Sequence, residues 1–333
     1  MQNFDKNRRL LLRAGLVPLT GAALSGLNAQ AQTDYPTRGI KIVIGFPPGT
    51  STDTWSRLTA LRLSAALKQP VHVDNKPGAH GQLGCVTVKN AEKDGYTLLY
   101  ASLGTAAINP SLYGSRLQYD TMKDFEPIVG VEKSTIYLGV AKNVPVTNVQ
   151  EMIAYVKANP GRVNYGSAGA GTTSHLAMEM LKKATGMQMT HVPYRGMANV
   201  IQDMLGGNLQ FAFDAAAAMV PQWTAGNLRL IGVASRKRMS IAPDIPTIEE
   251  QGVPNFEVRL WSGLFAPAGT PAAVIAKLNK AVNDELQAGT FGETMRSVGA
   301  EPFGGSSDDF KKFVGSEIAF WAPVIKNSGA VAD

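Results

Sequence analysis

Cysteine is nearly absent from this chain, since Cys85 is the only one among 333 residues. A single thiol forms no internal disulfide and supplies no cysteine-based metal site. Cys85 lies in a segment expected to be helical, near Leu83 and Val86, and we expect a buried, unreactive thiol. The histidine, aspartate and glutamate residues also lack the spacing of a metal site. The sequence therefore predicts no metal ion and no other cofactor.

Long apolar runs and clustered positive charge are also missing after residue 31. No later stretch reaches the roughly 20 apolar residues that a membrane-spanning helix needs. The longest basic run is Arg236-Lys237-Arg238, without interleaved aromatic residues, which argues against nucleic-acid binding. With 44% hydrophobic and 17% charged residues, the composition is that of a globular protein long enough for two domains.

The first 31 residues read as an export signal. A basic stretch, 8–13, precedes a mostly apolar run, 14–27, and Ala29-Gln30-Ala31 has the small-residue pattern read by signal peptidase. We expect export and cleavage after Ala31. Residues 7–13 also resemble a twin-arginine motif, so both the general secretory and the twin-arginine routes stay open. This segment carries half of the formal net charge of +6, which leaves a mildly basic chain suited to small anions.

Strand-like and helix-like segments alternate after residue 35. Asn148 and Glu151 form a capping-box pair, and apolar residues recur every four positions from Val274 to Leu286. Short apolar runs such as 97–100 and 230–233 are typical of buried strands. The pattern predicts an α/β fold with mostly parallel sheets flanked by helices. No low-complexity linker is present, which favours two domains that share strands over two domains joined by a tether.

Two glycine-rich loops about 120 residues apart are the main functional signal. The first, 45–53, follows the strand-like segment 40–44, and the second, 166–175, follows 163–165. Each precedes an amphipathic helix, whose N-terminus carries about half a positive charge beside exposed backbone N–H groups. One such loop in each half predicts a ligand held from both sides. Phe46 and Trp261 are candidates to line an apolar part of the site, whereas core packing is the favoured role of Trp55.

Neither loop fits a nucleotide. The first lacks the Gly-Lys-Ser/Thr ending of a phosphate-binding loop. The second has Ser174 where a dinucleotide fingerprint requires Gly or Ala, and no acidic residue follows at the ribose position.

A hydrolase is also disfavoured, because no Gly-x-Ser-x-Gly segment and no base beside a nucleophile occur. Each histidine (His72, His80, His175, His191) can be assigned a structural role, and His175 can simply support its loop. Asp53 falls in the opening turn of a helix, where a capping role is favoured. Asp214 follows the strand-like segment 211–213, at the edge where ligands bind, and suits a structural or a binding role equally.

Seven motifs spread over the chain resemble those of one known family: Gly45-Phe46-Pro47-Pro48-Gly49 with Asp53, Asn75-Lys76-Pro77-Gly78-Ala79 with Gly81, Asp94-Gly95-Tyr96-Thr97-Leu98-Leu99, Asn164-Tyr165-Gly166-Ser167-Ala168-Gly169 with Gly171-Thr172 and His175-Leu176, His191-Val192-Pro193-Tyr194-Arg195-Gly196, Phe213-Asp214 and Pro246-Thr247. The family is that of the Bug-type periplasmic solute receptors of tripartite tricarboxylate transporters, the TctC-like proteins. Thr50 and His80 replace glycines that are frequent there.

The resemblance implies a two-domain Venus-flytrap receptor of type II topology. Domain 1 would comprise 32–137 and 260–333, and domain 2 would comprise 138–259, with small carboxylates held between them. Tyr194 and Asp214 would flank the site. The full set of expected ligand-binding residues is Phe46, Gly49, Thr50, Ser51, Thr52, Asp53, Ser102, Gly104, Thr105, Ser167, Ala168, Gly169, Ala170, Gly171, Thr172, His175, Tyr194 and Asp214.

The function expected from loops and resemblance together is an exported, monomeric receptor, without catalytic residues. It would bind a small organic carboxylate and deliver it to the membrane permease subunits of a tripartite tricarboxylate transporter. Two alternatives stay open at this point: a carboxylate sensor for a signalling partner, and an enzyme such as a hydrolase on the same scaffold.

Overall fold

The computed structural model describes residues 34–331, and the chain from Pro36 onward clusters as one compact unit. The predicted export signal, 1–31, lies outside the described residues. Within 34–331, no helix has the length and apolarity required to cross a membrane.

Strands and helices alternate along the chain, as the sequence pattern predicts. The first half comprises β1 (Ile40–Ile44), α1 (Ser51–Leu67), β2 (Val71–Asn75), η1 (Ala79–Gly81), α2 (Gln82–Lys89), β3 (Thr97–Ser102), η2 (Gly104–Ile108), α3 (Asn109–Tyr113), η3 (Gly114–Arg116), α4 (Thr121–Asp124), β4 (Phe125–Ala141) and α5 (Val149–Ala158). The second half comprises β5 (Asn164–Ser167), α6 (Thr173–Thr185), β6 (Thr190–Pro193), α7 (Met197–Leu205), β7 (Phe211–Ala215), α8 (Ala216–Thr224), β8 (Leu228–Val233), β9 (Arg259–Pro267), α9 (Ala272–Gln287), α10 (Thr290–Ser297), β10 (Ala300–Gly304) and α11 (Ser307–Ser328).

The strands follow the order β2-β1-β3-β9-β4-β7-β5-β6, with β8 and β10 also paired to β4. At one end β2, β1 and β3 are parallel, and we call them the first trio. At the other end β6, β5 and β7 are parallel, and we call them the second trio. The expected α/β fold with parallel strands flanked by helices is confirmed, and β4 and β9 add an antiparallel pair between the trios.

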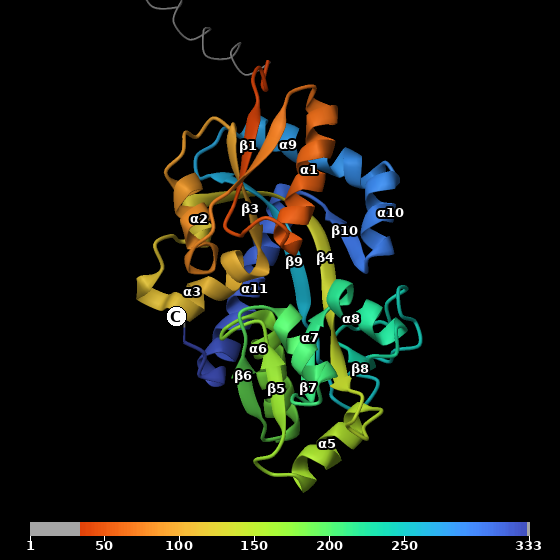
Figure 1. Ribbon diagram of the computed structural model, residues 1–333. Helices are drawn as coiled ribbons and strands as arrows, with labels where there is room; N and C mark the ends of the chain where they lie inside the picture. The colour runs from red at the N-terminus through yellow and green to blue at the C-terminus, as the bar shows by residue number, and fades with distance from the viewer. Residues whose placement is uncertain (1–33, 332–333) are drawn as a thin grey trace, which may run out of the picture. The chain divides into compact units, whose positions relative to one another are not determined.

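Strands β4 and β9 connect the two trios (Figure 1). The first part of β4 pairs with β9, from Phe125 opposite Pro267 to Thr135 opposite Arg259, and its last part pairs with β7 and β8. The expected domain boundaries at 137/138 and 259/260 fall within β4 and at the start of β9. These boundaries stay a prediction.

Helices cover both trios and bury apolar stripes against them. Helices α1 and α2 pack on the first trio, and α6 and α7 pack on the second. The predicted stripe of α9 is buried along Val274, Leu278, Val282 and Leu286. Helix α11 packs against η2, α3 and β4 as well as against α6. It therefore contacts elements that belong to both ends of the sheet.

The buried thiol and the predicted helix cap are both confirmed. Cys85 is 1% exposed in α2, and burial raises its pKa to about 12, which keeps it protonated and unreactive. The Asn148 side chain accepts a hydrogen bond from the backbone N–H of Glu151 at the start of α5. The Glu151 carboxylate in turn accepts from the N–H of Thr147, one residue before the position that a capping box uses.

Candidate ligand-binding pocket

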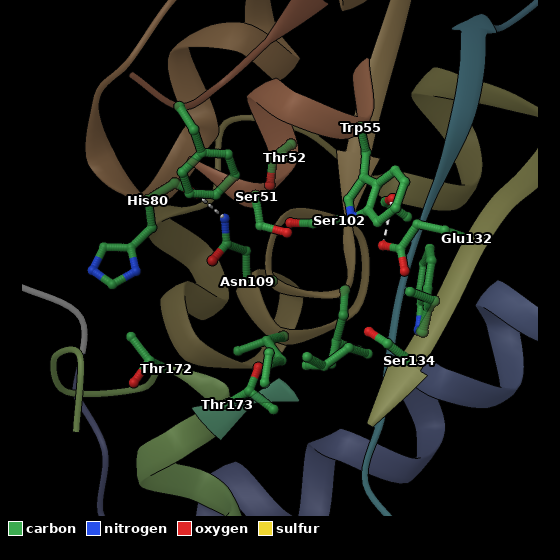
Figure 2. A pocket seen from close by; sticks show the side chains of 18 of the residues that line it. Ser51, Thr52, Trp55, His80, Ser102, Asn109, Glu132, Ser134, Thr172 and Thr173 are labelled. Atoms are coloured by element: carbon green, nitrogen blue, oxygen red, sulfur yellow. Dashed lines mark hydrogen bonds between the residues drawn. The ribbon is translucent and has the colours of Figure 1, made fainter. Parts of the chain in front are cut away.

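A cavity of about 260 Å³ lies where the carboxyl ends of β1, β3, β5 and β7 meet β4 and β9. Its walls come from the loops at the ends of both trios and from the connecting strands. Figure 2 shows the side chains of most of the lining residues. The lining consists of Phe46, Ser51, Thr52, Trp55, His80, Ser102, Leu103, Gly104, Ile108, Asn109, Glu132, Ser134, Gly171, Thr172, Thr173, Ala215, Leu260, Trp261 and Ser262.

The first glycine-rich loop is held in place by Asp53. Its carboxylate accepts hydrogen bonds from the Gly49 N–H at 3.0 Å, from Arg57 Nε at 3.0 Å and from Asn75 Nδ2 at 2.9 Å. The hydrogen bond from Arg57 is the main reason why the Asp53 pKa falls to about 2. Thr50 is the N-cap of α1 and accepts from the Asp53 N–H. Asp53 therefore organises the loop, in agreement with the favoured capping role, and does not line the pocket.

A close contact of two backbone segments explains one glycine of this loop. A side chain at Gly45 would place its Cβ 2.4 Å from Cα of Gly81, just before α2. Only glycine allows this approach, which brings His80 and Phe46 to the same pocket wall.

The second glycine-rich loop ends in α6 and presents that helix's N-terminus to the pocket. Thr172 is the N-cap, and its hydroxyl donates to the Gly169 carbonyl at 2.7 Å. Gly169 and Gly171 have φ values of +136° and +74°, which favour glycine. Gly171, Thr172 and Thr173 line the pocket, whereas the predicted residues Ser167, Ala168, Gly169 and Ala170 are not among its lining residues.

Two stacked imidazole rings contact the second loop and hold it in place. His175 and His191 have ring centroids 3.8 Å apart, and Tyr165 stacks on His191 at 5.0 Å. His175 Nδ1 accepts the Gly171 N–H, and His191 Nε2 is 2.6 Å from Ser167 Oγ. Burial lowers the pKa of His175, and burial together with His175 lowers that of His191 to about 4. Both rings are therefore neutral near pH 7 and position the loop without lining the pocket.

The remaining expected residues differ in their placement. Ser102 and Gly104 line the pocket, while Thr105 is buried behind them and accepts the Ser102 N–H. The Tyr194 hydroxyl donates to Asp203 and does not line the pocket. Asp214 is the last but one residue of β7 and precedes Ala215, which does line the pocket; burial raises the Asp214 pKa to about 6.

Several lining residues have no counterpart among the sequence-predicted ones. Glu132 and Ser134 come from β4, and Leu260 and Ser262 come from β9. In a sequence these positions look like ordinary strand residues, and only the pairing of β4 with β9 brings them to the cavity. Asn109 and His80 also line it; they lie 29 residues apart, and Asn109 Nδ2 donates to the His80 carbonyl.

Apart from Glu132, the lining combines neutral hydrogen-bonding groups with apolar side chains. Hydroxyls come from Ser51, Thr52, Ser102, Ser134, Thr172, Thr173 and Ser262, and no lysine or arginine is among the lining residues. The N-termini of α1 and α6, of 17 and 13 residues, both reach the cavity. Within 34–331, no group of His, Cys, Asp and Glu is arranged to hold a metal ion. Such a lining suits a small anion held by hydroxyls and backbone N–H groups.

Solved structures share this architecture. The R. palustris protein Rpa4515, solved with adipate, superposes with a TM-score of 0.81 at 35% identity, over 89% of this chain and 99% of that one. The periplasmic binding protein BugD gives 0.77 at 33% identity, over 89% and 99%. MatC of Rhodopseudomonas palustris, solved with malate, gives 0.76 at 30% identity, over 87% and 100%. The fold and the pocket thus define a Venus-flytrap solute-binding receptor rather than an enzyme.

The sequence comparisons identify the family. The model of the tripartite tricarboxylate transporter family receptors matches residues 56–330, and the chain belongs to this family. A UPF0065 protein of Bordetella pertussis is 34% identical over 321 residues, which cover 96% of this chain and 97% of that protein. Protein BugT of the same organism is 33% identical over 310 residues, covering 92% and 95%. The resemblance carried by the motifs is confirmed, and membership of a periplasmic receptor family implies export.

Proposed function

We propose that this protein captures a small organic carboxylate in the pocket and delivers it to the permease of a tripartite tricarboxylate transporter. One observation carries the proposal: the N-termini of α1 and α6, from opposite ends of the sheet, share one cavity without a lysine or arginine in its lining. The two lobes, 32–137 with 260–333 and 138–259, would close on the ligand.

The binding free energy would come from hydrogen bonds and from apolar contact. Ser51, Thr52 and Thr173 offer hydroxyls near the two helix N-termini, where a carboxylate is stabilised by roughly 0.3–1 kcal/mol per terminus. Hydrogen bonds to a charged acceptor contribute about 1.5–3 kcal/mol each. Phe46, Trp55, Leu260 and Trp261 would contact the carbon skeleton.

Similar structures support the ligand class. Rpa4515 was solved with adipate and MatC with malate, and both ligands are small carboxylates. By this proposal, Phe46, Ser51, Thr52, Ser102, Gly104, Gly171 and Thr172 contact the ligand. Gly49, Thr50, Asp53, Thr105, His175 and residues 167–170 shape the loops that present those groups, and Tyr194 and Asp214 flank the second lobe.

Binding is tested by a thermal-shift screen of small carboxylates on the protein purified from the periplasm, followed by calorimetry. Ligand-induced closure should reduce the radius of gyration in solution scattering. Identical scattering curves with and without saturating ligand would contradict closure, and a screen without a stabilising carboxylate would contradict carboxylate capture.

Export and delivery need separate measurements. Mass spectrometry of the periplasmic protein should give an N-terminus at Gln32, and strains deficient in either export route distinguish general secretion from the twin-arginine pathway. Deletion of the gene should abolish uptake of the ligand. Normal uptake combined with a lost transcriptional response to the ligand would instead assign the receptor to a signalling partner.

A further inference from the structure

Glu132 is the one acidic residue among the pocket-lining residues. It belongs to β4 and lies opposite Ser262 of β9 in the sheet register. Its side chain is largely buried, with 6% of the residue exposed. Figure 2 shows its carboxyl group between Trp55 and Ser134, on the side of the pocket away from His80. Capture of an anion by hydroxyls and helix N-termini gives no reason for an acidic residue at this position.

Only one of the two Glu132 oxygens is satisfied. Oε1 accepts a hydrogen bond from Ser262 Oγ at 2.8 Å, and Ser262 Oγ lies 2.7 Å from the Tyr100 hydroxyl. Oε2 is buried and has no hydrogen-bond partner of good geometry among residues 34–331, although the Ser134 hydroxyl lies close enough to lower the Glu132 pKa. An unpaired oxygen of a buried carboxylate is costly, so a donor brought by a ligand would relieve a penalty that the free protein carries.

The hydrogen-bond chain fixes Glu132 as an acceptor when it is charged. Ser262 has one proton, and it must donate that proton to the carboxylate, which leaves Tyr100 to donate to Ser262. Burial and the nearby Glu132 charge raise the pKa of Tyr100 well above its usual range, so this phenol keeps its proton. A ligand group that meets Glu132 must therefore be a donor.

We propose that Glu132 makes the pocket selective for carboxylates whose second polar group is a nitrogen that donates hydrogen bonds, such as an ammonium or amide group. Dicarboxylates of the same length would bind less tightly. This inference rests on the proposed function, because it assumes that the carboxylate binds at the helix N-termini. A second carboxylate at Glu132 would face a like charge in a buried site, which disfavours binding. An ammonium group there would also lie near the indole rings of Trp55 and Trp261, which line the same pocket and attract cations.

The charge of Glu132 depends on pH in an accessible range. Burial raises its pKa to about 7, and the hydroxyls of Ser262 and Ser134 act in the opposite direction. The Tyr100 phenol reaches Glu132 through Ser262, and His80 lines the opposite side of the pocket. The selectivity should be strongest above pH 7 and should weaken in acid, where a neutral Glu132 can itself donate a hydrogen bond to a second carboxylate.

The test is calorimetry on the protein purified from the periplasm, with two series of matched probes. One series is adipate, adipic acid monoamide, 6-aminohexanoate and hexanoate, and the other consists of the four-carbon analogues. At pH 8.5 the amide or amine should bind about tenfold or more tightly than the dicarboxylate of equal length. The ratio should fall severalfold at pH 5.5, a measurement that needs no variant.

Glu132→Gln should reduce the amine-to-dicarboxylate ratio to about threefold or less. Glu126→Gln is the matched control, because Glu126 lies on the same strand outside the pocket and pairs with Lys311; it should keep the original ratio. A ratio that responds neither to Glu132→Gln nor to pH, or a dicarboxylate that binds best at pH 8.5, would overturn the role of Glu132 while leaving carboxylate capture intact. Failure of both series to bind would count against the proposed function itself.

Discussion

Replacing Asp53 by Asn tests whether this buried carboxylate organises the first loop. The ion pair with Arg57 is an i,i+4 pair at 3.0 Å in which Asp53 is nearly inaccessible and Arg57 is about half exposed. A pKa that falls from 3.8 to about 2 corresponds to about 2.4 kcal/mol of stabilisation of the charged form. Because Arg57 is partly screened by water, and Asn retains part of the hydrogen bonding, we expect a loss of about 1–2 kcal/mol.

The matched control is Asp284→Asn, since Lys280 and Asp284 also form an i,i+4 pair but both side chains are exposed. Urea denaturation at pH 7 should show a loss of less than about 0.5 kcal/mol for this control. The Asp53 pKa is lowered in the folded state, so its contribution is complete above pH 4 and is lost as the pH falls toward 2. The difference in the free energy of unfolding between the original protein and Asp53→Asn should therefore become smaller in acid.

Two results would refute this reasoning. If Asp53→Asn lost no more stability than Asp284→Asn, the hydrogen bonds to Asp53 would contribute no more to stability than an exposed ion pair. If the difference in the free energy of unfolding stayed constant between pH 7 and pH 3, the loss of stability would come from packing and not from charge. The same variant should bind carboxylates several times more weakly, because a loop that must be ordered on binding costs conformational entropy.

Three other substitutions or treatments probe the pocket and the core. Thr172→Val should weaken carboxylate binding about tenfold in calorimetry, because the hydroxyl that donates to the Gly169 carbonyl and shapes the second loop is lost. Thr294→Val, at an exposed position of α10, should leave affinity unchanged; equal affinities of Thr172→Val and the original protein would remove Thr172 from the site. Gly45→Ala should lower the free energy of unfolding, measured by urea denaturation, by more than about 2 kcal/mol, because its Cβ would clash with backbone atoms. Gly196→Ala, where the space is open, should cost little. Cys85 should resist a thiol reagent in the folded protein and react fully in denaturant, and rapid labelling without denaturant would disprove its burial.

Local chemistry made the two loops predictable. Glycines with positive φ, Ser/Thr caps and the apolar stripes of the following helices are short-range features, and they are readable from neighbouring residues. The motifs also indicated the right family. The supporting role of His175 followed from its place beside the loop, and the stacked His191 explains how that support is achieved.

The division between lining residues and supporting residues could not be read in the same way. Asp53 and Thr105 lie within predicted binding segments, yet their side chains turn to the backbone behind the pocket. Thr52 and Ser102, a few positions away, line the cavity. A difference of one or two positions on a helix start reverses the direction of a side chain, and composition does not record that direction.

The sequence by itself determined the α/β class, the two glycine-rich loops and the family, because each depends on residues that are close together along the chain. Only the tertiary structure decided that both loops open onto one cavity and that Glu132 faces Ser262 there. That pairing depends on the register of β4 against β9, between residues 130 positions apart. Strand register is set by packing over the whole sheet, so no local pattern encodes it.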